Sequence, residues 1–256
     1  MTLSKQLLQS NALMMVPQNY SVNDGTGIRT LLFFAGCPLR CKWCANPESY
    51  TMELKEGFVY AYTVEEILKE IEKQKIFYRF SGGGVTFSGG EAMLQADFLS
   101  VLVDKLYDDG VHLAIETSGS FNFEEVEDIL AKMDQIFVDI KHMDADTHRY
   151  YTGKSNQMIL HNIQKISNLN GELIIRIPLI EGVNATDDNI KRTAEFVKSA
   201  VDIPQIELLP YHTLGEYKYE VLNITNEFDA TAIPSRERIK YFEELIEKIG
   251  VQVVTY

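Results

Sequence analysis

The sequence predicts an α/β protein built as a partial barrel of six βα units, and three observations support this prediction. Short apolar segments alternate with helical segments along most of the 256 residues, which is typical of parallel strands joined by right-handed crossovers. About six such units can be counted, two fewer than the eight of a closed barrel. No composition break or flexible linker divides the chain. We therefore expect one domain over residues 1–256, in which residues 1–22 form an N-terminal extension.

The elements follow from apolar patterning and from helix-capping residues. Thr63 and Glu66 form a capping box at the start of the first helix. Asn122 and Glu125 suggest a second capped start. The expected strands, in chain order, are 28–35, 84–88, 111–117, 135–141, 172–180, 206–211 and a short 251–255. The expected helices are 63–75, 92–108, one starting at 122, 160–168, 187–200 and 235–248.

Composition excludes several classes of function. The formal net charge is −13, which disfavours nucleic acids and anionic membrane surfaces as partners. No apolar run approaches the roughly 18–20 residues of a membrane span, and the first residues do not lead into a signal-peptide core. Three clustered cysteines make no disulfide framework. We expect a cytoplasmic protein in a reducing, anaerobic setting.

The most informative motif is a cysteine triplet. All three cysteines of the chain lie within the segment Cys37-Pro38-Leu39-Arg40-Cys41-Lys42-Trp43-Cys44. A [4Fe–4S] cluster normally takes four thiolates, so three would leave one iron open to a substrate or cofactor. An open position is typical of catalytic metal sites, whereas structural zinc ligands, the alternative, usually come as separated pairs. The triplet favours an iron–sulfur site.

Polar residues gather where the expected strands end, which is where parallel barrels carry their functional groups. The second strand ends in Ser88-Gly89-Gly90-Glu91. Adjacent glycines let a backbone approach a ligand closely, although such a turn needs no ligand. Glu116 ends the third strand, Arg176 alternates with apolar neighbours on the fifth, and His212 follows the sixth. A lone histidine is more often structural, so His212 stands out only by its position.

The fourth expected strand carries two charges on one face. Alternation places Asp139 and Lys141 opposite Ile136, Val138 and Ile140. Because the apolar face should pack against helices, the charged face should point into the barrel. Buried charges are costly unless they are paired or bound. Either the two residues pair with each other, or they clamp a zwitterionic or ribose-bearing ligand.

Five motifs in this order resemble one known family. They are Asp24-Gly25-Thr26-Gly27-Ile28-Arg29, the cysteine triplet, Ser81-Gly82-Gly83-Gly84-Val85-Thr86-Phe87-Ser88-Gly89-Gly90-Glu91, Asp139-Ile140-Lys141 and Leu208-Leu209-Pro210-Tyr211-His212. Together they resemble the radical S-adenosylmethionine (SAM) superfamily, and within it the glycyl-radical-enzyme activating enzymes, most closely the pyruvate formate-lyase activating type. The resemblance runs from about Asn23 to the C-terminus.

The resemblance implies a radical SAM (β/α)6 partial TIM barrel and roles for individual residues. Cys37, Cys41 and Cys44 would hold one [4Fe–4S] cluster, whose fourth iron would bind the amino and carboxylate groups of SAM. The residues implied in binding SAM are Trp43, Ala45, Gly89, Gly90, Glu91, Asp139, Ile140, Lys141, Arg176 and His212. The residues implied in binding the glycine-bearing loop of a protein substrate are Asp24, Gly25, Gly27 and Arg29.

The implied reaction is the reductive cleavage of SAM to methionine and a 5′-deoxyadenosyl radical. That radical would take a hydrogen atom from a backbone glycine of a partner glycyl radical enzyme. The resemblance also implies a flavodoxin- or ferredoxin-type electron donor, and we expect the chain to act as a monomer.

The sequence departs from the family pattern at several places. Thr26 stands where the family commonly has proline, and Glu116 stands where the formate-lyase type has aspartate, which bears on a monovalent cation expected near Glu116. Residues 37–48 look more like activators of other glycyl radical enzymes, such as glycerol or choline lyases. Those usually carry an inserted ferredoxin-like domain with more cysteines, and this chain has no such cysteines. We therefore expect pyruvate formate-lyase as the target. The alternatives are a glycyl radical enzyme of dehydratase, lyase or decarboxylase type, or a small-molecule substrate.

Overall fold

The computed structural model describes residues 11–256 and contains a central parallel sheet. Its six main strands are β3 (Arg29–Phe34), β5 (Gly84–Gly89), β6 (His112–Thr117), β7 (Gln135–Asp139), β8 (Glu172–Leu179) and β9 (Gln205–Pro210). They lie in chain order, and the short β10 (Gln252–Val253) continues the sheet in parallel beyond β9. The six-unit α/β prediction is confirmed.

Three N-terminal strands extend the sheet at the β3 side. β1 (Asn11–Met14) pairs antiparallel with β3 and with β4 (Tyr60–Thr63), and β2 (Gln18–Ser21) pairs antiparallel with β3. The described part of the expected N-terminal extension therefore belongs to the sheet; residues 1–10 of that extension lie outside the described residues. Edges β4 and β10 are not paired with each other, so the sheet stays open.

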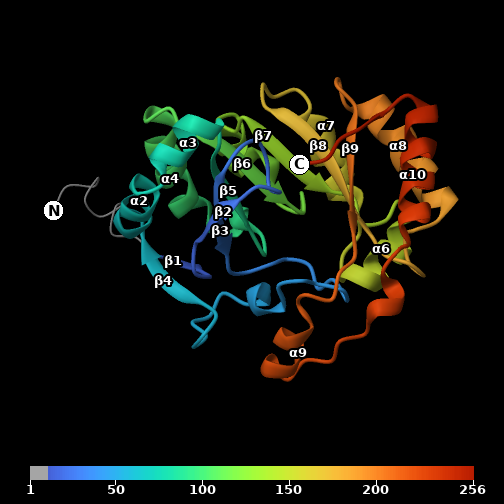
Figure 1. Ribbon diagram of the computed structural model, residues 1–256, viewed down its shortest axis with the longest axis horizontal. Helices are drawn as coiled ribbons and strands as arrows, with labels where there is room; N and C mark the ends of the chain where they lie inside the picture. Colours follow the sequence, from blue (N-terminus) through green and yellow to red (C-terminus); the bar gives the residue numbers. More distant parts are fainter. Residues whose placement is uncertain (1–10) are drawn as a thin grey trace.

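Helices cover the outside of this curved sheet (Figure 1). They are α2 (Val64–Glu72), α3 (Lys75–Ser81), α4 (Ala96–Asp108), α5 (Glu127–Leu130), α6 (Ala145–Thr152), α7 (Gln157–Ile166), α8 (Asp187–Ala200) and α10 (Arg236–Ile249). The short α9 (Glu216–Leu222) lies away from the sheet, next to the 3-10 turn Pro47–Tyr50. In α2, Val64, Ile67 and Ile71 are buried at helical spacing. None of the helices within residues 11–256 is long and apolar enough to cross a membrane.

Several helix boundaries differ from the expected ones. The capping box of Thr63 and Glu66 is present, but α2 ends at Glu72 and a separate α3 begins at Lys75. Asn122 makes no capping bond to the backbone; its side chain instead donates to the Glu125 carboxylate at 2.9 Å. A 3-10 turn (Phe123–Glu125) and the four-residue α5 follow, so the helix begins at Glu127 and the expected capped start at Asn122 was wrong.

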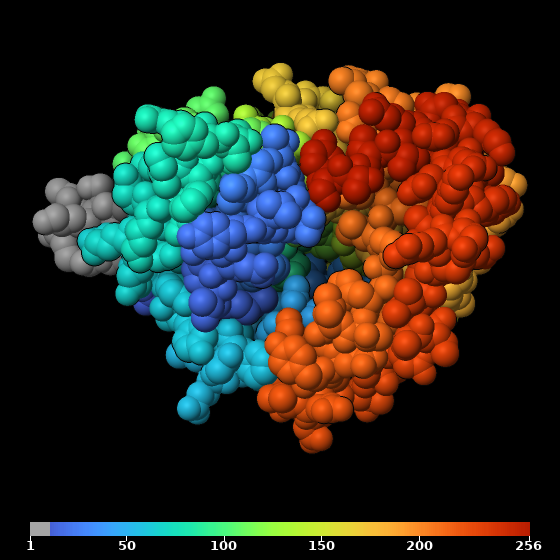
Figure 2. Space-filling model, in the orientation of Figure 1, coloured from blue at the N-terminus to red at the C-terminus, as the bar shows by residue number. Residues whose placement is uncertain are grey.

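The barrel interior has its own small core. Ala114, Phe137 and Ile174 are fully buried on the inner face of the sheet, with Val254 and Tyr256 packed against them. The larger core lies between the sheet and the helices. Figure 2 shows a hollow in the surface between the N-terminal strands (blue), the last residues (red) and α9 (orange). The open edge of the sheet therefore leaves the interior accessible from one side.

Candidate active site

The cysteine loop leaves the C-terminal end of β3 and is fixed by backbone hydrogen bonds on several sides. Arg40 and Lys42 donate their amides to the carbonyls of Thr152 and Tyr151, at 2.7 and 3.0 Å. The Gly36 amide donates to the Ser49 carbonyl at 2.7 Å. In Figure 1 this segment runs between the sheet, α6 and α9.

Two phenols hold the cysteine carbonyls directly. Tyr50 Oη donates to the Cys41 carbonyl and Tyr219 Oη donates to the Cys44 carbonyl, both at 2.8 Å. Burial raises the pKa of each phenol, so both remain neutral donors. No spacing pattern in the sequence marks these tyrosines, and they were not among the expected site residues.

The three thiols are free and share one electrostatic environment. Burial raises the pKa of Cys37 to about 11 and that of Cys41 to about 12, and it also raises the pKa of Cys44. The Lys141 ammonium opposes this rise at all three sulfurs. Within residues 11–256, no three His, Cys, Asp or Glu side chains are grouped around one point as ligands of a single metal ion are. The loop thus presents one buried and two partly buried thiols, all within the electrostatic influence of Lys141.

The double glycine at the end of β5 braces this loop. Gly90 donates its amide to the Phe34 carbonyl and Glu91 donates to the Gly36 carbonyl, both at 2.8 Å. Gly89 has a φ of +116°, and a Cβ there would meet Phe34 backbone at 2.3 Å. A Cβ on Gly90 would lie 2.2 Å from the Gly36 carbonyl oxygen, so close backbone packing within the protein requires both glycines; the close approach to a ligand stays a prediction.

Glu91 is buried and faces the neighbouring strand end. Its carboxylate accepts hydrogen bonds from the Thr117 hydroxyl and from the amide and hydroxyl of Ser118. The side chain is 0% exposed. Burial raises its pKa, although the Ser118 and Thr117 hydrogen bonds oppose that rise. Glu91 thereby ties the ends of β5 and β6 together, and its carboxylate is fully occupied.

On β7 the expected alternation is confirmed. Ile136, Val138 and Ile140 lie in the outer core, while Lys141 and Asp139 form an ion pair at 2.5 Å. Burial lowers the pKa of Lys141, but Asp139 and the cysteine sulfurs outweigh this and raise it. Because the Ile140 side chain points into the outer core, its expected contribution to a cofactor site is restricted to its main chain.

Arg176 lies inside the barrel and joins two carboxylates. It pairs with Glu116 and, through Nε at 2.6 Å, with Glu207. Its guanidinium also stacks on Phe137, 3.8 Å from the ring centroid. The Ser88 hydroxyl donates to the other oxygen of Glu116 at 2.6 Å. Sequence reasoning identified Arg176 and Glu116 separately but missed Glu207, whose charge is buried on β9.

A narrow crevice separates the cysteine loop from α9. Its free volume is about 10 Å³, with room for roughly one water. The residues that line it include Trp43, Ala45, Tyr211, His212, Gly215 and Tyr219. The structure therefore brings Trp43, Ala45 and His212, three of the expected SAM contacts, together on one crevice.

Helix α9 closes this crevice and was not expected from the sequence. Besides Tyr219, Lys218 anchors it by bonds to Asn46 Oδ1 at 2.7 Å and to the buried Glu48 at 2.5 Å. A Cβ on Gly215, just before α9, would lie 2.7 Å from the Ala45 carbonyl. The helix is thus packed directly on the loop that follows the third cysteine.

The segment 24–29, expected to bind a peptide, fills the side of the barrel. Thr86 donates to the Asp24 carbonyl at 2.8 Å, and the Thr26 amide donates to Gln135 Oε1 at 3.0 Å. Arg29 is 0% exposed and donates to the Thr26 and Val85 carbonyls at 2.9 and 2.7 Å. Arg29 therefore shapes this loop from beneath, and the exposed surface comes from its neighbours such as Thr26.

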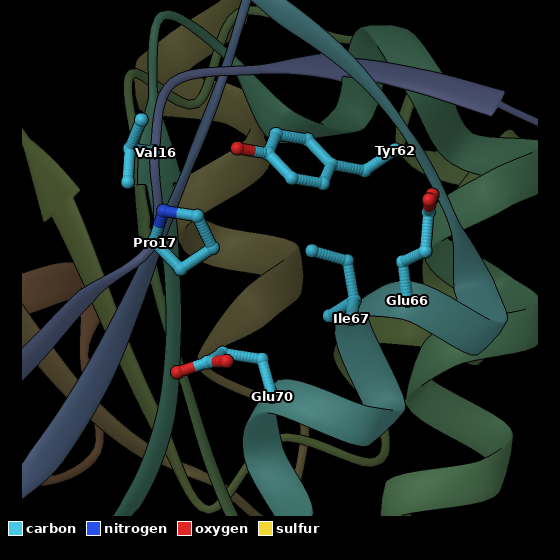
Figure 3. Close-up of a pocket in the computed structure, with 6 residues that line it drawn as sticks. All are labelled: Val16, Pro17, Tyr62, Glu66, Ile67 and Glu70. Atoms are coloured by element: carbon cyan, nitrogen blue, oxygen red, sulfur yellow. The ribbon is translucent and has the colours of Figure 1, made fainter.

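Another cavity, of about 380 Å³, lies between the β1–β2 turn and α2 (Figure 3). Its lining residues are Val16, Pro17, Tyr62, Glu66, Ile67 and Glu70. It is on the side of the molecule away from α6 and α9 (Figure 1). It contains none of the expected site residues.

The chain was compared with known families and curated proteins. The family model "Radical SAM superfamily" matches residues 31–197. A trans-4-hydroxy-L-proline dehydratase activating enzyme from Clostridioides difficile is 36% identical over 93% of this chain and 96% of its own length. A pyruvate formate-lyase-activating enzyme from Clostridium pasteurianum is 37% identical over 88% of this chain and 94% of its own length.

Solved structures agree with this relationship. A domain of pyruvate-formate lyase-activating enzyme from Bacteroides vulgatus has a TM-score of 0.54 at 31% identity, covering 67% of this chain and 98% of that one. A radical SAM methyltransferase from Sphaerobacter thermophilus, with a TM-score of 0.64, 16% identity and coverage of 94% and 76%, shares the fold. These matches, and the cysteine loop at the end of β3, lead to one conclusion. The chain belongs to the radical SAM superfamily and, within it, to the glycyl-radical-enzyme activating enzymes.

Proposed function

We propose that Cys37, Cys41 and Cys44 hold a [4Fe–4S] cluster beside a SAM molecule, the two groups that membership of the family implies. The residues present fit these groups. Three free thiols lie on one eight-residue loop and each feels the Lys141 ammonium, and position 90 has no space for a side chain. When bound, the cluster supplies the electron that cleaves SAM to methionine and a 5′-deoxyadenosyl radical. The placement of three free thiols on one loop, within the electrostatic influence of Lys141, is the observation that carries this proposal.

The surrounding residues form two regions, each suited to a different part of the SAM molecule. Asp139 and Lys141, side by side next to the thiols, suit the charged methionine part and the ribose hydroxyls. Trp43, Ala45 and His212 suit the adenine and its sugar, which would lie at the edge of the crevice under α9 because the crevice itself has room for about one water. Gly89 and Gly90 bring backbone close to the same place. Glu91 and Arg176 act through their neighbours, because both are buried and bonded to other side chains.

We propose that the substrate is a glycine-bearing loop of a partner enzyme, from which the 5′-deoxyadenosyl radical takes a hydrogen atom. The hollow in Figure 2 offers a segment of chain a route to the interior. The surface around Thr26, supported by Arg29 and Gly27, is the candidate contact for that segment. The barrel wall keeps water from the radical.

Pyruvate formate-lyase is the proposed target among the glycyl radical enzymes. The match to the dehydratase activating enzyme extends over 292 residues, more than the 256 of this chain, so that relative contains insertions that this chain lacks. The match to the C. pasteurianum formate-lyase-activating enzyme extends over 228 residues and needs no such insertion. The absence of further cysteines supports the same choice. Activation of a dehydratase or decarboxylase is the second candidate, because the relatives include such activating enzymes.

The electron must come from outside, since the three cysteines provide for one cluster only. We propose a flavodoxin- or ferredoxin-type donor that docks where the cysteine loop meets the surface. Arg40 and Lys154 are exposed there, and within residues 11–256 neither forms an ion pair. Gly153 lies beside Arg40: a Cβ added to Gly153 would be 3.7 Å from the Cβ of Arg40. This local positive charge suits an acidic donor.

The test is to load the protein with iron and sulfide without oxygen, reduce it, and measure 5′-deoxyadenosine formed from SAM. We expect product, and we expect a glycine-loop peptide from a pyruvate formate-lyase to increase its rate. The Cys41→Ser protein should bind less iron and should form no 5′-deoxyadenosine. Stimulation only by loops of other glycyl radical enzymes would reassign the target. Absence of SAM cleavage by protein with a full cluster would contradict the proposal.

A further inference from the structure

A buried ion network inside the barrel leaves no free oxygen on Glu116. One carboxylate oxygen is bound by Arg176 and the other accepts the Ser88 hydroxyl at 2.6 Å. The side chains of Arg176 and Glu116 are 5% and 19% exposed. The carboxylate that family resemblance associates with a monovalent cation is therefore already paired with a cationic side chain of this chain.

The guanidinium cannot easily leave this position. Its Nε binds Glu207 at 2.6 Å, and its plane lies on the Phe137 ring at 3.8 Å. Glu207 is itself held, because its second oxygen accepts the Tyr256 amide at 2.9 Å. Moving Arg176 away would leave two buried carboxylates unpaired, which is strongly unfavourable.

The length of the side chain at position 116 decides whether this contact forms. Glu116 starts on β6 and Arg176 on β8, with β7 between them. An aspartate would withdraw the carboxylate by about 1.5 Å, one carbon–carbon bond. An aspartate at this position would therefore lose the direct contact with the guanidinium and leave a carboxylate oxygen free to bind a cation. Glutamate keeps this contact with the guanidinium.

We infer that Arg176 takes the place of a monovalent cation in this enzyme, so that SAM binds without potassium or sodium. This inference rests on the proposed function, because it concerns the SAM site. The residues do not fit an ion beside Glu116, and they make one unnecessary. Arg176 is a positioning residue here: it fixes Glu116 and Ser88 at the strand ends and need not touch the reacting atoms.

The experiment measures SAM affinity of the cluster-loaded protein in potassium, sodium and choline chloride at equal ionic strength. We expect the dissociation constant of the wild-type protein to change less than twofold among the salts. In Glu116→Asp, affinity should fall at least tenfold in choline and recover in potassium. Glu124→Asp, an exposed residue paired with Lys165, should behave as the wild type.

A second readout is thermal unfolding of the unloaded protein. The wild-type melting temperature should be equal in potassium and choline, and Glu116→Asp should melt higher in potassium. A wild-type SAM affinity at least fivefold weaker in choline would overturn the inference, even if Glu116→Asp did not fold. A Glu116→Asp protein that ignores potassium would overturn it too. If the cluster-loaded protein failed to bind SAM in all three salts, the proposed function would be refuted, and the inference with it.

Discussion

Gly90 packs against Cys37 so closely that a Cβ on the glycine would stand 3.1 Å from the Cβ of the cysteine. The same Cβ would lie 2.2 Å from the Gly36 carbonyl oxygen. The turn after β5 and the start of the cysteine loop are therefore one packed unit, although 52 residues separate Cys37 from Gly90 in the chain. Changes at Gly90 should be transmitted to the cysteine ligands.

Gly90→Ala should reduce iron binding several-fold, because the added methyl group must displace the backbone of the cysteine loop. The unfolding free energy should fall by about 1–3 kcal/mol, as for other overpacked sites. Iron and sulfide per chain and thermal unfolding measure both effects. In the control Gly110→Ala, the new methyl meets nothing within 4 Å, so only the strain of a positive φ remains. Wild-type iron content in Gly90→Ala would refute the coupling.

Lys141→Met removes the cation that faces all three thiols and leaves Asp139 without its partner. We expect the unfolding free energy to fall by about 2 kcal/mol, less than for a fully buried pair, because the Asp139 side chain is 27% exposed. SAM affinity should fall as well. Lys69→Met breaks a pair on the surface and should change stability by less than about 0.5 kcal/mol. Equal effects of the two variants would show that the Lys141 pair is not special.

Tyr219→Phe removes the hydroxyl that fastens α9 to the Cys44 carbonyl. One such hydrogen bond contributes about 1 kcal/mol, so α9 should open more often and become more susceptible to limited proteolysis. SAM affinity should fall about fivefold. Tyr217→Phe is the matched control, since Tyr217 is on the same short helix and 58% exposed. A Tyr219→Phe protein as protease-resistant as the wild type would show that the hydroxyl does not anchor α9.

Lys154→Glu reverses a charge beside the cysteine loop. It should slow SAM cleavage driven by a reduced flavodoxin several-fold and increase the dependence of that rate on salt. Cleavage driven by a small chemical reductant should not change, because that reductant needs no docking surface. Lys105→Glu, an exposed lysine on α4, controls for the change in net charge. Loss of both reactions in Lys154→Glu would indicate damage to the site itself.

His148 should make the fold sensitive to mild acid. It is 0% exposed, Nδ1 lies 2.5 Å from the Lys154 carbonyl, and burial lowers its pKa below the ordinary 6.5. The unfolded chain therefore takes up a proton first as pH falls below about 6.5, and stability is lost in that range. Melting temperatures between pH 7.5 and 5.5 should fall less for His148→Asn than for the wild type. His161→Asn, exposed on α7, should retain the full wild-type loss.

The sequence predicted the parts of the fold whose side chains carry a clear period. Helix α8 begins and ends where expected, at Asp187 and Ala200. Strand β7 places its apolar and charged residues on the expected faces. Helices α6 and α9 were not predicted, for a physical reason. The buried residues of α6 are His148 and Thr152, and α9 buries only Tyr219, so neither helix shows an apolar stripe.

For the site, motif and position predicted roles for the cysteines, Gly90, Asp139 and Lys141, and the structure places these residues near one another; their binding roles stay predictions. Motif and position were not enough to tell a residue that binds a ligand from one that supports it. Glu91 and Arg29 are charged and stand in motifs, yet both are 0% exposed and bonded within the protein. Which groups neutralise a buried charge depends on strands far apart in the chain, as with Glu207 and Arg176, and no local pattern contains that information.

Within residues 11–256, the edge strands β4 and β10 do not pair with each other, and this has a consequence for what kind of molecule can be recognised. A closed barrel can be entered only through its open end, which favours substrates that are small or have a free chain end. A sheet left open along one side is a slot, and a bent stretch of polypeptide can be laid into it sideways while both of its ends remain attached to a folded body. The residues that select the partner would then lie along the two edges of the sheet, at β4 and β10, rather than at the bottom of the barrel. Few of them would need to change for a different partner to be accepted.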